Sequence, residues 1–255
     1  MISRGAGKMH EICADSCALF LDVDGTLGDM QPTPNDVFAA DGLVSTLQDL
    51  MVRLNGALAI VSGRRIEEID HILSPIHPIA AGVHGVEMRR AENGKIETSE
   101  PTFSNSLLRA LQNLKDASPG IVIETKYAAV SVHYRQAPEM RAWLEGNLRR
   151  LISAHHQDME LGQGRMVFEI LPRGTSKGRA VRDLMRLPLF AERIPIMIGD
   201  DSPDLSAVHT ATEMGGYGLT VAGEFFAKEV SYFNGPAHVR SWLRDFSRQS
   251  HVILP

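Results

Sequence analysis

The sequence predicts an α/β protein in which a parallel-sheet core carries a smaller inserted α/β domain. Short apolar runs at residues 18–23, 58–61 and 194–198 have the composition of buried strands, and each ends at a polar or glycine-rich turn. Between the first two runs, leucines at helical spacing indicate an amphipathic helix over residues 41–54. Because strands that alternate with helices form parallel sheets covered by helices, these segments define the core.

The middle of the chain follows a different order of elements. Helical patterns cover residues 104–117 and 138–154, and strand patterns cover residues 121–125, 128–134 and 166–171. This helix–strand–strand order lies between two parts of the core pattern and predicts an insertion with boundaries near Pro101 and Pro172. We therefore expect a core domain of residues 1–101 and 173–255 and an inserted domain of residues 102–172.

The composition argues against several classes of protein. The chain has 255 residues, of which 22% are charged, and a net charge of -5, so it lacks the basic footprint that nucleic acid or an anionic membrane requires. Cys13 and Cys17 lack the second pair that a zinc site needs, and we interpret them as reduced, structural residues. The sequence shows neither a membrane-length apolar run nor a secretory signal. We expect a cytoplasmic monomer that binds a small molecule.

An acid pair follows the first predicted strand. Asp22 and Asp24 are separated by one residue and lie at the carboxyl end of the strand, where parallel sheets bind their ligands. Two such carboxylates can share a hard cation, and one can attack phosphorus while the other transfers protons. Gly25 permits a sharp turn after the pair. The alternative is an Asx turn in which both acids only hold the loop.

Two further segments could bind a phosphate. Ser62, Gly63 and Arg64 follow the second predicted strand and offer a hydroxyl and backbone N–H groups for a phosphate cradle. Ser62 could instead be a helix N-cap. Lys177 opens a later helix and could pair with both a nucleophilic carboxylate and a phosphoryl group, which otherwise repel each other. The alternative for Lys177 is a solvated side chain in the first helical turn.

Three carboxylates follow the third predicted strand. Asp200, Asp201 and Asp204 are so close in sequence that they would repel one another unless a cation or basic group lay among them. We expect Asp200 to bind a metal directly, and Asp201 and Asp204 to orient waters and Lys177. The alternative is an acidic surface loop in which Asp204 caps a helix. The chain thus contains, in order, an acid pair, a hydroxyl, a lysine and an acid cluster. Together these features indicate a phosphoryl-transfer site far more specifically than any one of them alone.

These four segments resemble the four motifs of the haloacid dehalogenase superfamily of phosphohydrolases. The resemblance implies a Rossmann-like hydrolase core, with Asp22 as the nucleophile that forms an aspartyl-phosphate and Asp24 as the general acid and base. Ser62 and Lys177 would bind the phosphate. Mg²⁺ would be held by Asp22, Asp24 (through its backbone carbonyl) and Asp200, with Asp201 and Asp204 around it. Relatives that remove halide lack the second acid of the first motif, so its presence here favours phosphoryl transfer.

Within the superfamily, the chain is similar over nearly its whole length to trehalose-6-phosphate phosphatases. The matching stretches are residues 81–87, 133–138 and 172–178. The inserted domain corresponds to the cap of that family, whose side chains hold the sugar. The matching positions in this chain are Glu124, Lys126, His133, Arg135 and Glu169. Carboxylates and lysine suit sugar hydroxyls, although Glu124 and Lys126 could be merely polar positions on one strand face and His133 could be structural.

The resemblance implies magnesium-dependent hydrolysis of trehalose 6-phosphate to trehalose and phosphate. Another capped sugar-phosphate phosphatase, a phosphomannomutase and a non-catalytic sugar-phosphate sensor are the alternatives. The intact Asp22 opposes the sensor, because a pure binder needs no nucleophile. The chain departs from the family pattern where Leu205, and not an acid, follows Asp204, and across residues 215–226. Its rate or substrate preference could therefore differ from that of close relatives.

Overall fold

The computed structural model of the chain describes residues 11–30, 39–98, 103–116, 118–126, 128–155 and 158–253. The chain divides into two compact units, Met1–Glu97 with Ser176–Pro255 and Thr98–Thr175. The boundary expected near Pro101 lies outside the described residues. The second boundary was expected at Pro172, and the second unit ends at Thr175. None of the described helices is long and apolar enough to span a membrane.

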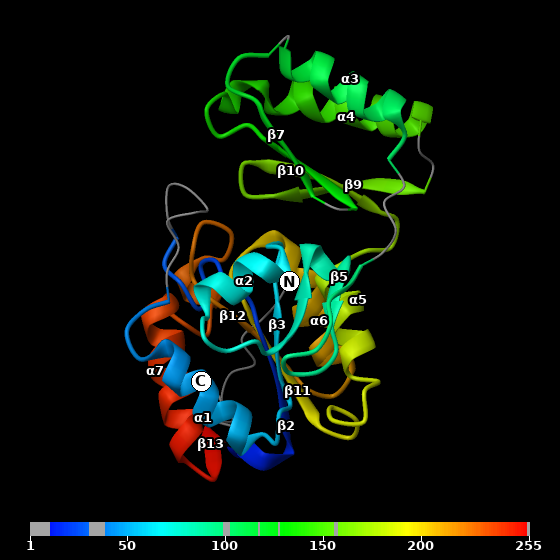
Figure 1. The fold of residues 1–255 in the computed structure, drawn as a ribbon. Helices are drawn as coiled ribbons and strands as arrows, with labels where there is room; N and C mark the ends of the chain where they lie inside the picture. The colour runs from blue at the N-terminus through cyan, green and yellow to red at the C-terminus, as the bar shows by residue number, and fades with distance from the viewer. Residues whose placement is uncertain are drawn as a thin grey trace. The chain divides into compact units, whose positions relative to one another are not determined.

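The first unit is built on a seven-stranded sheet with the order β12–β11–β2–β3–β4–β5–β6 (Figure 1). The strand bounds are Cys17–Leu21 (β2), Leu58–Val61 (β3), Ile79–Gly82 (β4), Glu87–Arg89 (β5), Glu97–Thr98 (β6), Ile194–Gly199 (β11) and Tyr217–Thr220 (β12). Neighbouring strands from β12 to β4 are parallel, and β5 pairs with β4 in the antiparallel sense. The predicted α/β fold with a parallel sheet is confirmed.

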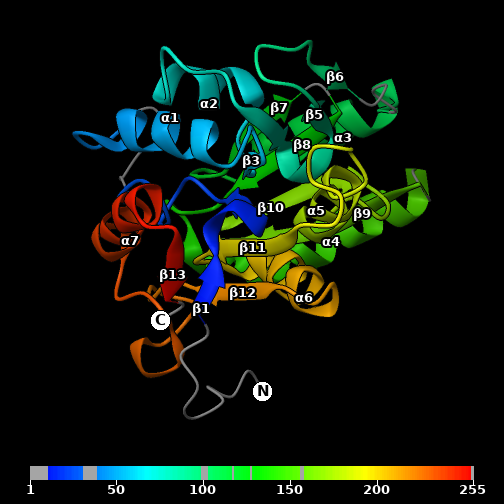
Figure 2. The same cartoon turned by 90° about the horizontal axis from the view of Figure 1, so that it is seen from below.

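Helices cover both faces of this sheet. Their bounds are Leu43–Arg53 (α1), Ile66–Ile72 (α2), Lys177–Leu184 (α5), Leu205–Glu213 (α6) and Pro236–Arg248 (α7). α1 and α7 pack together on one face, and α5 and α6 pack together on the other (Figures 1 and 2). Short 3-10 helices lie at Ala14–Ser16 (η1), Val83–Gly85 (η3), Ser202–Asp204 (η5) and Lys228–Val230 (η6). A separate two-stranded sheet pairs β1 (Glu11–Cys13) with β13 (His251–Ile253).

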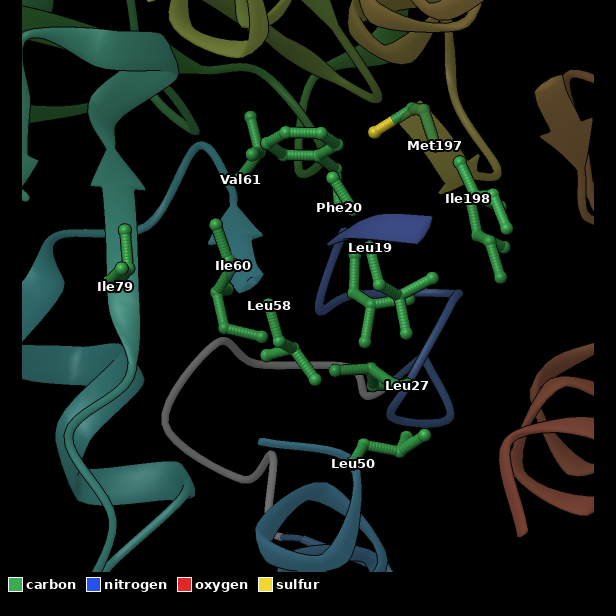
Figure 3. Packing of buried hydrophobic residues seen from close by; sticks show 14 of the residues in the cluster. Leu19, Phe20, Leu27, Leu50, Leu58, Ile60, Val61, Ile79, Met197 and Ile198 are labelled. Atoms are coloured by element: carbon green, nitrogen blue, oxygen red, sulfur yellow. The ribbon is translucent and has the colours of Figure 1, made fainter. Parts of the chain in front are cut away.

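The apolar side chains of the parallel strands form the core of the first unit (Figure 3). Phe20 on β2, Ile60 on β3 and Ile198 on β11 are fully buried, and Phe20 stacks on Phe190 with 5.4 Å between ring centroids. Burial on both faces of the sheet explains why these strands are continuous apolar runs in the sequence. Burying a side chain of this size stabilises the fold by about 1.5–3 kcal/mol. The ends of these strands therefore provide a rigid platform for polar residues.

The second unit is a four-stranded antiparallel sheet in the order β7–β8–β10–β9 with two helices. The bounds are Asn105–Asp116 (α3), Val122–Lys126 (β7), Ala129–His133 (β8), Pro138–Met140 (η4), Arg141–His155 (α4), Met159–Gly164 (β9) and Val167–Pro172 (β10). Val130, Val132 and Phe168 belong to the buried cluster that includes leucines of α3 and α4. The helices thus cover one face of the sheet. β9 escaped prediction because Gly162, Gln163 and Gly164 lack the apolar alternation of a strand.

Candidate active site

Two acids from distant parts of the sequence lie at the same edge of the parallel sheet. Asp22 directly follows β2, and Asp200 directly follows β11. These strands are parallel neighbours, and the backbone N–H of Asp22 donates to the carbonyl of Ile198 at 3.1 Å. Both acids therefore lie beyond the carboxyl ends of their strands, where an open α/β sheet binds its ligands.

Lys177 connects Asp22 to a third acid. Its Nζ lies 2.7 Å from Asp22 Oδ1 and 2.6 Å from Asp204 Oδ1. All three side chains are buried, so water screens their charges little. Burial lowers the pKa of Lys177, but the carboxylates of Asp204 and Asp22 outweigh this effect and raise the pKa above its ordinary value. Ser176 caps α5 by accepting the N–H of Arg179 at 3.1 Å, which fixes the turn that carries Lys177.

Asp204 is engaged through both of its carboxylate oxygens. Besides its contact with Lys177, it accepts the backbone N–H groups of Asp200 and Asp201 through Oδ2 at 3.1 and 3.0 Å. Asp201 accepts the N–H of Ser202 at 2.7 Å and caps η5. Asp204 thus holds both the lysine and the loop that carries Asp200, whereas Asp201 stabilises the local turn.

The acid cluster carries more negative charge than Lys177 balances. Burial and the charge of Asp204 raise the pKa of Asp22 to about 7, although Lys177 opposes the shift. Burial and the charges of Asp22 and Asp204 raise the pKa of Asp200 to about 9. Burial and like charges in this environment favour the protonated carboxyl groups, whereas a further cation would favour the ionised ones.

The chemistry of the cluster fits a divalent cation. Asp22, Asp200 and Asp204 each place one oxygen within 4.8 Å of the others, and hard carboxylate oxygens are the ligands that Mg²⁺ prefers. Gly25 has a φ of 74° and lies so close to Asp200 that a Cβ there would overlap its carboxylate. Thr26 Oγ1 donates to Asp200 Oδ1 at 3.3 Å. Among the described residues, this group of acids does not include the side chain of Asp201, which was expected around the metal, or that of Asp24, which was expected to bind the metal through its backbone carbonyl.

An arginine holds the Asp24 carboxylate. Arg64 donates from Nε to Asp24 Oδ2 and from Nη2 to Asp24 Oδ1, both at 2.6 Å. A bidentate pair of this kind fixes the orientation of both planar groups. Burial lowers the pKa of Arg64, but the hydrogen bond and charge of Asp24 raise it above its ordinary value. Arg64 was predicted in the phosphate cradle. Its pairing with Asp24, across 40 positions of the sequence, had no local signal.

The loop after β3 is tied to its neighbours through backbone groups. Ser62 Oγ accepts the N–H of Arg64 at 3.2 Å. Ser62 is not the helix N-cap that was considered as an alternative, because α2 begins at Ile66 with Arg65 in the cap position. Buried Glu87, to which the sequence pattern assigned no role, accepts the N–H of Ile66 at 2.7 Å and ties the start of α2 to β5. The loop geometry is therefore set by β5 as well as by β3.

The turn η3 beside this loop has an unusual backbone. The φ angles are 48° at Val83, 57° at His84 and 104° at Gly85. For a residue other than glycine, this left-handed region costs about 1–2 kcal/mol, so surrounding contacts must hold the turn. The N–H of Val83 donates to the carbonyl of Arg64 at 2.8 Å, and the N–H of His84 donates to the carbonyl of Ser62 at 3.0 Å. The sequence pattern assigned His84 no function, because its backbone conformation and contacts leave no local signal.

In the second unit, the predicted sugar-binding residues Glu124, His133 and Glu169 share one face of the sheet with Ser131, which was not predicted. Glu124, Ser131 and Glu169 are neighbours across β7, β8 and β10, and His133 lies two residues from Ser131 on the same face. Ser131 Oγ donates to Glu169 Oε1 at 3.4 Å, and His133 Nε2 lies 3.3 Å from Glu124 Oε2. Since the helices cover the opposite face, these side chains form a polar cluster on the other face, in which Ser131 and Glu169 are buried and Glu124 and His133 are partly exposed.

The other two predicted residues of this unit, Lys126 and Arg135, are not shown to belong to this polar face. Lys126 ends β7, but its side chain lies outside the described residues. Arg135 is exposed and follows the end of β8. The predicted catalytic and metal residues thus belong to the first unit, and the predicted sugar-binding residues belong to the second.

Comparison with known proteins points to one family. The family model described as Trehalose-phosphatase matches residues 20–232. A probable trehalose-phosphate phosphatase of Sinorhizobium fredii is 38% identical over 217 residues, which cover 85% of this chain and 82% of that protein. The trehalose-6-phosphate phosphatase of Escherichia coli is 37% identical over 229 residues, or 89% of this chain and 85% of its own. The crystal structure of a trehalose-6-phosphate phosphatase related protein has a TM-score of 0.70 at 27% identity, covering 90% of this chain and 96% of that chain.

Proposed function

The chain belongs to the trehalose-phosphatase family, and from this premise we propose that it hydrolyses trehalose 6-phosphate through an aspartyl-phosphate on Asp22 with the aid of Mg²⁺. The relationship itself makes the chain a phosphoric monoester hydrolase. One observation carries the finer proposal: Lys177 Nζ lies 2.7 Å from Asp22 Oδ1 inside a buried acid cluster. A site that only bound phosphate would have no need of a buried carboxylate, which repels that anion.

In the first step, a carboxylate oxygen of Asp22 attacks the phosphorus atom. The new bond joins Asp22 to the phosphoryl group, and the bond between phosphorus and the sugar oxygen breaks. Lys177 offsets the negative charge of the nucleophile and the phosphoryl group, which otherwise repel each other. Asp24, released from Arg64 and in its protonated form, gives a proton to the departing sugar oxygen and is left as a carboxylate.

In the second step, water removes the phosphoryl group from Asp22. Asp24 accepts a proton from the water as its oxygen attacks phosphorus, and the bond to Asp22 breaks. The products are phosphate and the regenerated Asp22 carboxylate. Arg64, now paired with Asp24 at 2.6 Å, must release it before Asp24 reaches the substrate. The phosphoryl group is an anion that offers the guanidinium another partner.

Asp22 and Asp200 would hold Mg²⁺, while Asp204 keeps Lys177 and the neighbouring loop in place. When bound, the ion would stabilise the negative charge that develops on the phosphoryl oxygens. Thr26 holds the Asp200 carboxylate through its hydrogen bond, and Gly25, which has no side chain, leaves room for that carboxylate. Because Asp200 and Asp22 come from neighbouring strands, the rigid sheet sets the spacing of the two ligands.

The polar face of the second unit would bind the sugar. Glu124 and Glu169 offer carboxylate oxygens to sugar hydroxyls, and Ser131 and His133 orient them through the contacts at 3.4 and 3.3 Å. A buried carboxylate such as Glu169 discriminates strongly, because a substrate without the matching hydroxyl leaves it unpaired. This unit would therefore supply specificity to the chemistry of the first unit.

The test is phosphate release from trehalose 6-phosphate, sucrose 6-phosphate, glucose 6-phosphate and mannose phosphates, with Mg²⁺ and then with a chelator. We expect a strong preference for trehalose 6-phosphate that disappears when the metal is removed. Equal activity on all these substrates would be consistent with the proposed phosphatase mechanism but would contradict trehalose 6-phosphate as the specific substrate. A mutase would conserve esterified phosphate, and a sensor would release none.

A further inference from the structure

We propose that the turn η3 is a positioning element that sets the spacing between the loop of Ser62 and the helix of Lys177, with His84 as its principal residue. The inference rests on the proposed phosphatase function, because those two groups are the expected phosphate ligands. It adds a residue to the machinery of the first unit that touches the phosphate loop and not the reacting atoms.

The backbone of the turn determines how the phosphate loop is oriented. Hydrogen bonds from Val83 N–H to the Arg64 carbonyl at 2.8 Å and from His84 N–H to the Ser62 carbonyl at 3.0 Å lie on either side of Gly63. In a trans peptide the carbonyl and the following N–H point in opposite directions. The bond to the Ser62 carbonyl therefore turns the N–H of Gly63 to the side of the loop that faces away from the turn.

The His84 side chain supports the same loop. A Cβ placed on Gly63 would lie 2.9 Å from His84 Nε2 and 3.0 Å from Cε1, so the imidazole occupies the space that a side chain at position 63 would need. His84 is 6% exposed, which means that the ring is packed between the loop and the protein interior. A smaller side chain would leave a void on one side of Gly63 and allow the loop to shift toward it.

The other end of the turn rests on the helix that carries Lys177. A Cβ on Gly85 would lie 3.0 Å from the Cβ of Ala180 and 3.7 Å from the carbonyl of Ser176, both in or next to the first turns of α5. The backbone of Gly85 therefore packs directly against this helix. Three consecutive residues thus contact both phosphate-binding elements, and any change in the turn changes their separation.

The strained backbone supports a functional role for this arrangement. Val83 is β-branched and adopts a φ of 48°, and His84 follows with a φ of 57°. Neighbouring residues of this kind in the left-handed region persist only where the surroundings over-determine them, and such strain concentrates at active sites and ligand clamps. Here the surroundings are the phosphate loop and α5, so the strain is stored between the two groups whose spacing matters.

The test compares His84→Ala with His84→Asn, because asparagine tolerates the left-handed region and retains a polar side chain. We expect His84→Ala to raise the inhibition constant of inorganic phosphate about tenfold, the order of loss expected for a small misplacement of binding groups. It should lower kcat/KM by a similar factor for both trehalose 6-phosphate and p-nitrophenyl phosphate, since phosphate is common to both. His84→Asn should recover part of this loss.

The matched control is the pair His84→Gly and Glu192→Gly. Glu192 is exposed and has a φ of 64°. Glycine relieves the strain of a positive φ at either position, but only His84→Gly alters the phosphate loop, so the pair separates the effect of backbone strain from that of loop position. Unchanged phosphate inhibition in His84→Ala together with a lowered thermal midpoint would overturn the proposal and leave a purely structural role. If the wild-type protein cleaves p-nitrophenyl phosphate but not trehalose 6-phosphate, the proposed substrate is wrong. The role of His84 is then tested by the activity on p-nitrophenyl phosphate and by the inhibition constant of phosphate.

Discussion

In the first unit, the side chains of Lys177, Asp22 and Asp204 are 4%, 6% and 0% exposed, whereas those of His133 and Glu124 in the second unit are 32% and 43% exposed. The buried charges are fixed by one another and cannot rearrange without a large loss of free energy. The half-exposed pair is screened by water and is worth little to stability. A rigid charged site suits bond making and breaking, whereas the second unit combines the buried Glu169 with the partly exposed Glu124 and His133, a mixture that suits recognition of hydroxyl groups.

The largest effect that would sharpen this contrast is expected from Asp22→Asn. An amide cannot serve as the nucleophile, so kcat should fall by about 10⁴ to 10⁶ on both trehalose 6-phosphate and p-nitrophenyl phosphate. Steady-state phosphate release measures the effect. Asp15→Asn, a change at an exposed acid of the same unit, is the control and should keep normal turnover. Substantial activity in Asp22→Asn would refute the aspartyl-phosphate mechanism.

Lys177→Met should weaken both catalysis and folding. Removing this cation leaves the buried carboxylates of Asp22 and Asp204 without their partner, and breaking a buried pair from one side costs about 3–5 kcal/mol. Chemical denaturation in the presence of chelator gives the free energy of unfolding. Lys95→Met, at an exposed position of the same unit, should leave it nearly unchanged. Equal stability of the two variants would contradict the coupling of these charges.

The acid cluster should make magnesium binding depend on pH. The raised pKa values of Asp22, about 7, and Asp200, about 9, mean that the metal must displace protons. Apparent affinity should therefore rise from pH 6 to pH 8, by about tenfold per pH unit for each proton released. Calorimetric titration in buffers of different ionisation enthalpy counts these protons. The Asp200→Asn variant should release fewer protons when it binds Mg²⁺. A magnesium affinity that does not change with pH would contradict the proposed displacement of protons by the metal.

The same pKa shifts predict how the metal-free protein responds to pH. A carboxyl group whose pKa is raised on folding binds its proton more tightly in the folded state, so it favours folding at low pH and loses that contribution as the pH rises. The chelated protein should therefore lose stability as the pH rises above the ordinary Asp pKa, until about pH 7 for the contribution of Asp22 and about pH 9 for that of Asp200. Thermal unfolding across this range, with and without Mg²⁺, measures the trend. Magnesium should stabilise the protein most at the alkaline end.

The smallest effect is expected from the second unit. Glu169→Gln keeps the size of the side chain but changes its hydrogen bonding, so KM for trehalose 6-phosphate should rise about tenfold. Activity on p-nitrophenyl phosphate should change little, because that substrate has no sugar. Glu139→Gln, in an exposed position of the same unit, is the control. Equal losses on both substrates would refute the division of labour between the two units.

Local patterns were sufficient for several elements of the first unit. The apolar run at Leu58–Val61 coincides with β3, and the helix expected over residues 41–54 contains α1, Leu43–Arg53. Fully buried parallel strands and amphipathic helices have strong periodic signatures, which explains these agreements. The strand β9, Met159–Gly164, has no such signature and was found only in the structure.

The sequence by itself determined which residues stand at the ends of the strands, because hydrophobic periodicity and the turn residues that interrupt it are local properties. It thereby indicated Asp22, Lys177 and Asp200 as neighbours at one edge of the sheet. The tertiary structure alone decided that Arg64 pairs with Asp24, and it showed that Lys177 contacts both Asp22 and Asp204. Such pairings depend on burial and on contacts between segments far apart in the chain, and only the folded packing supplies these.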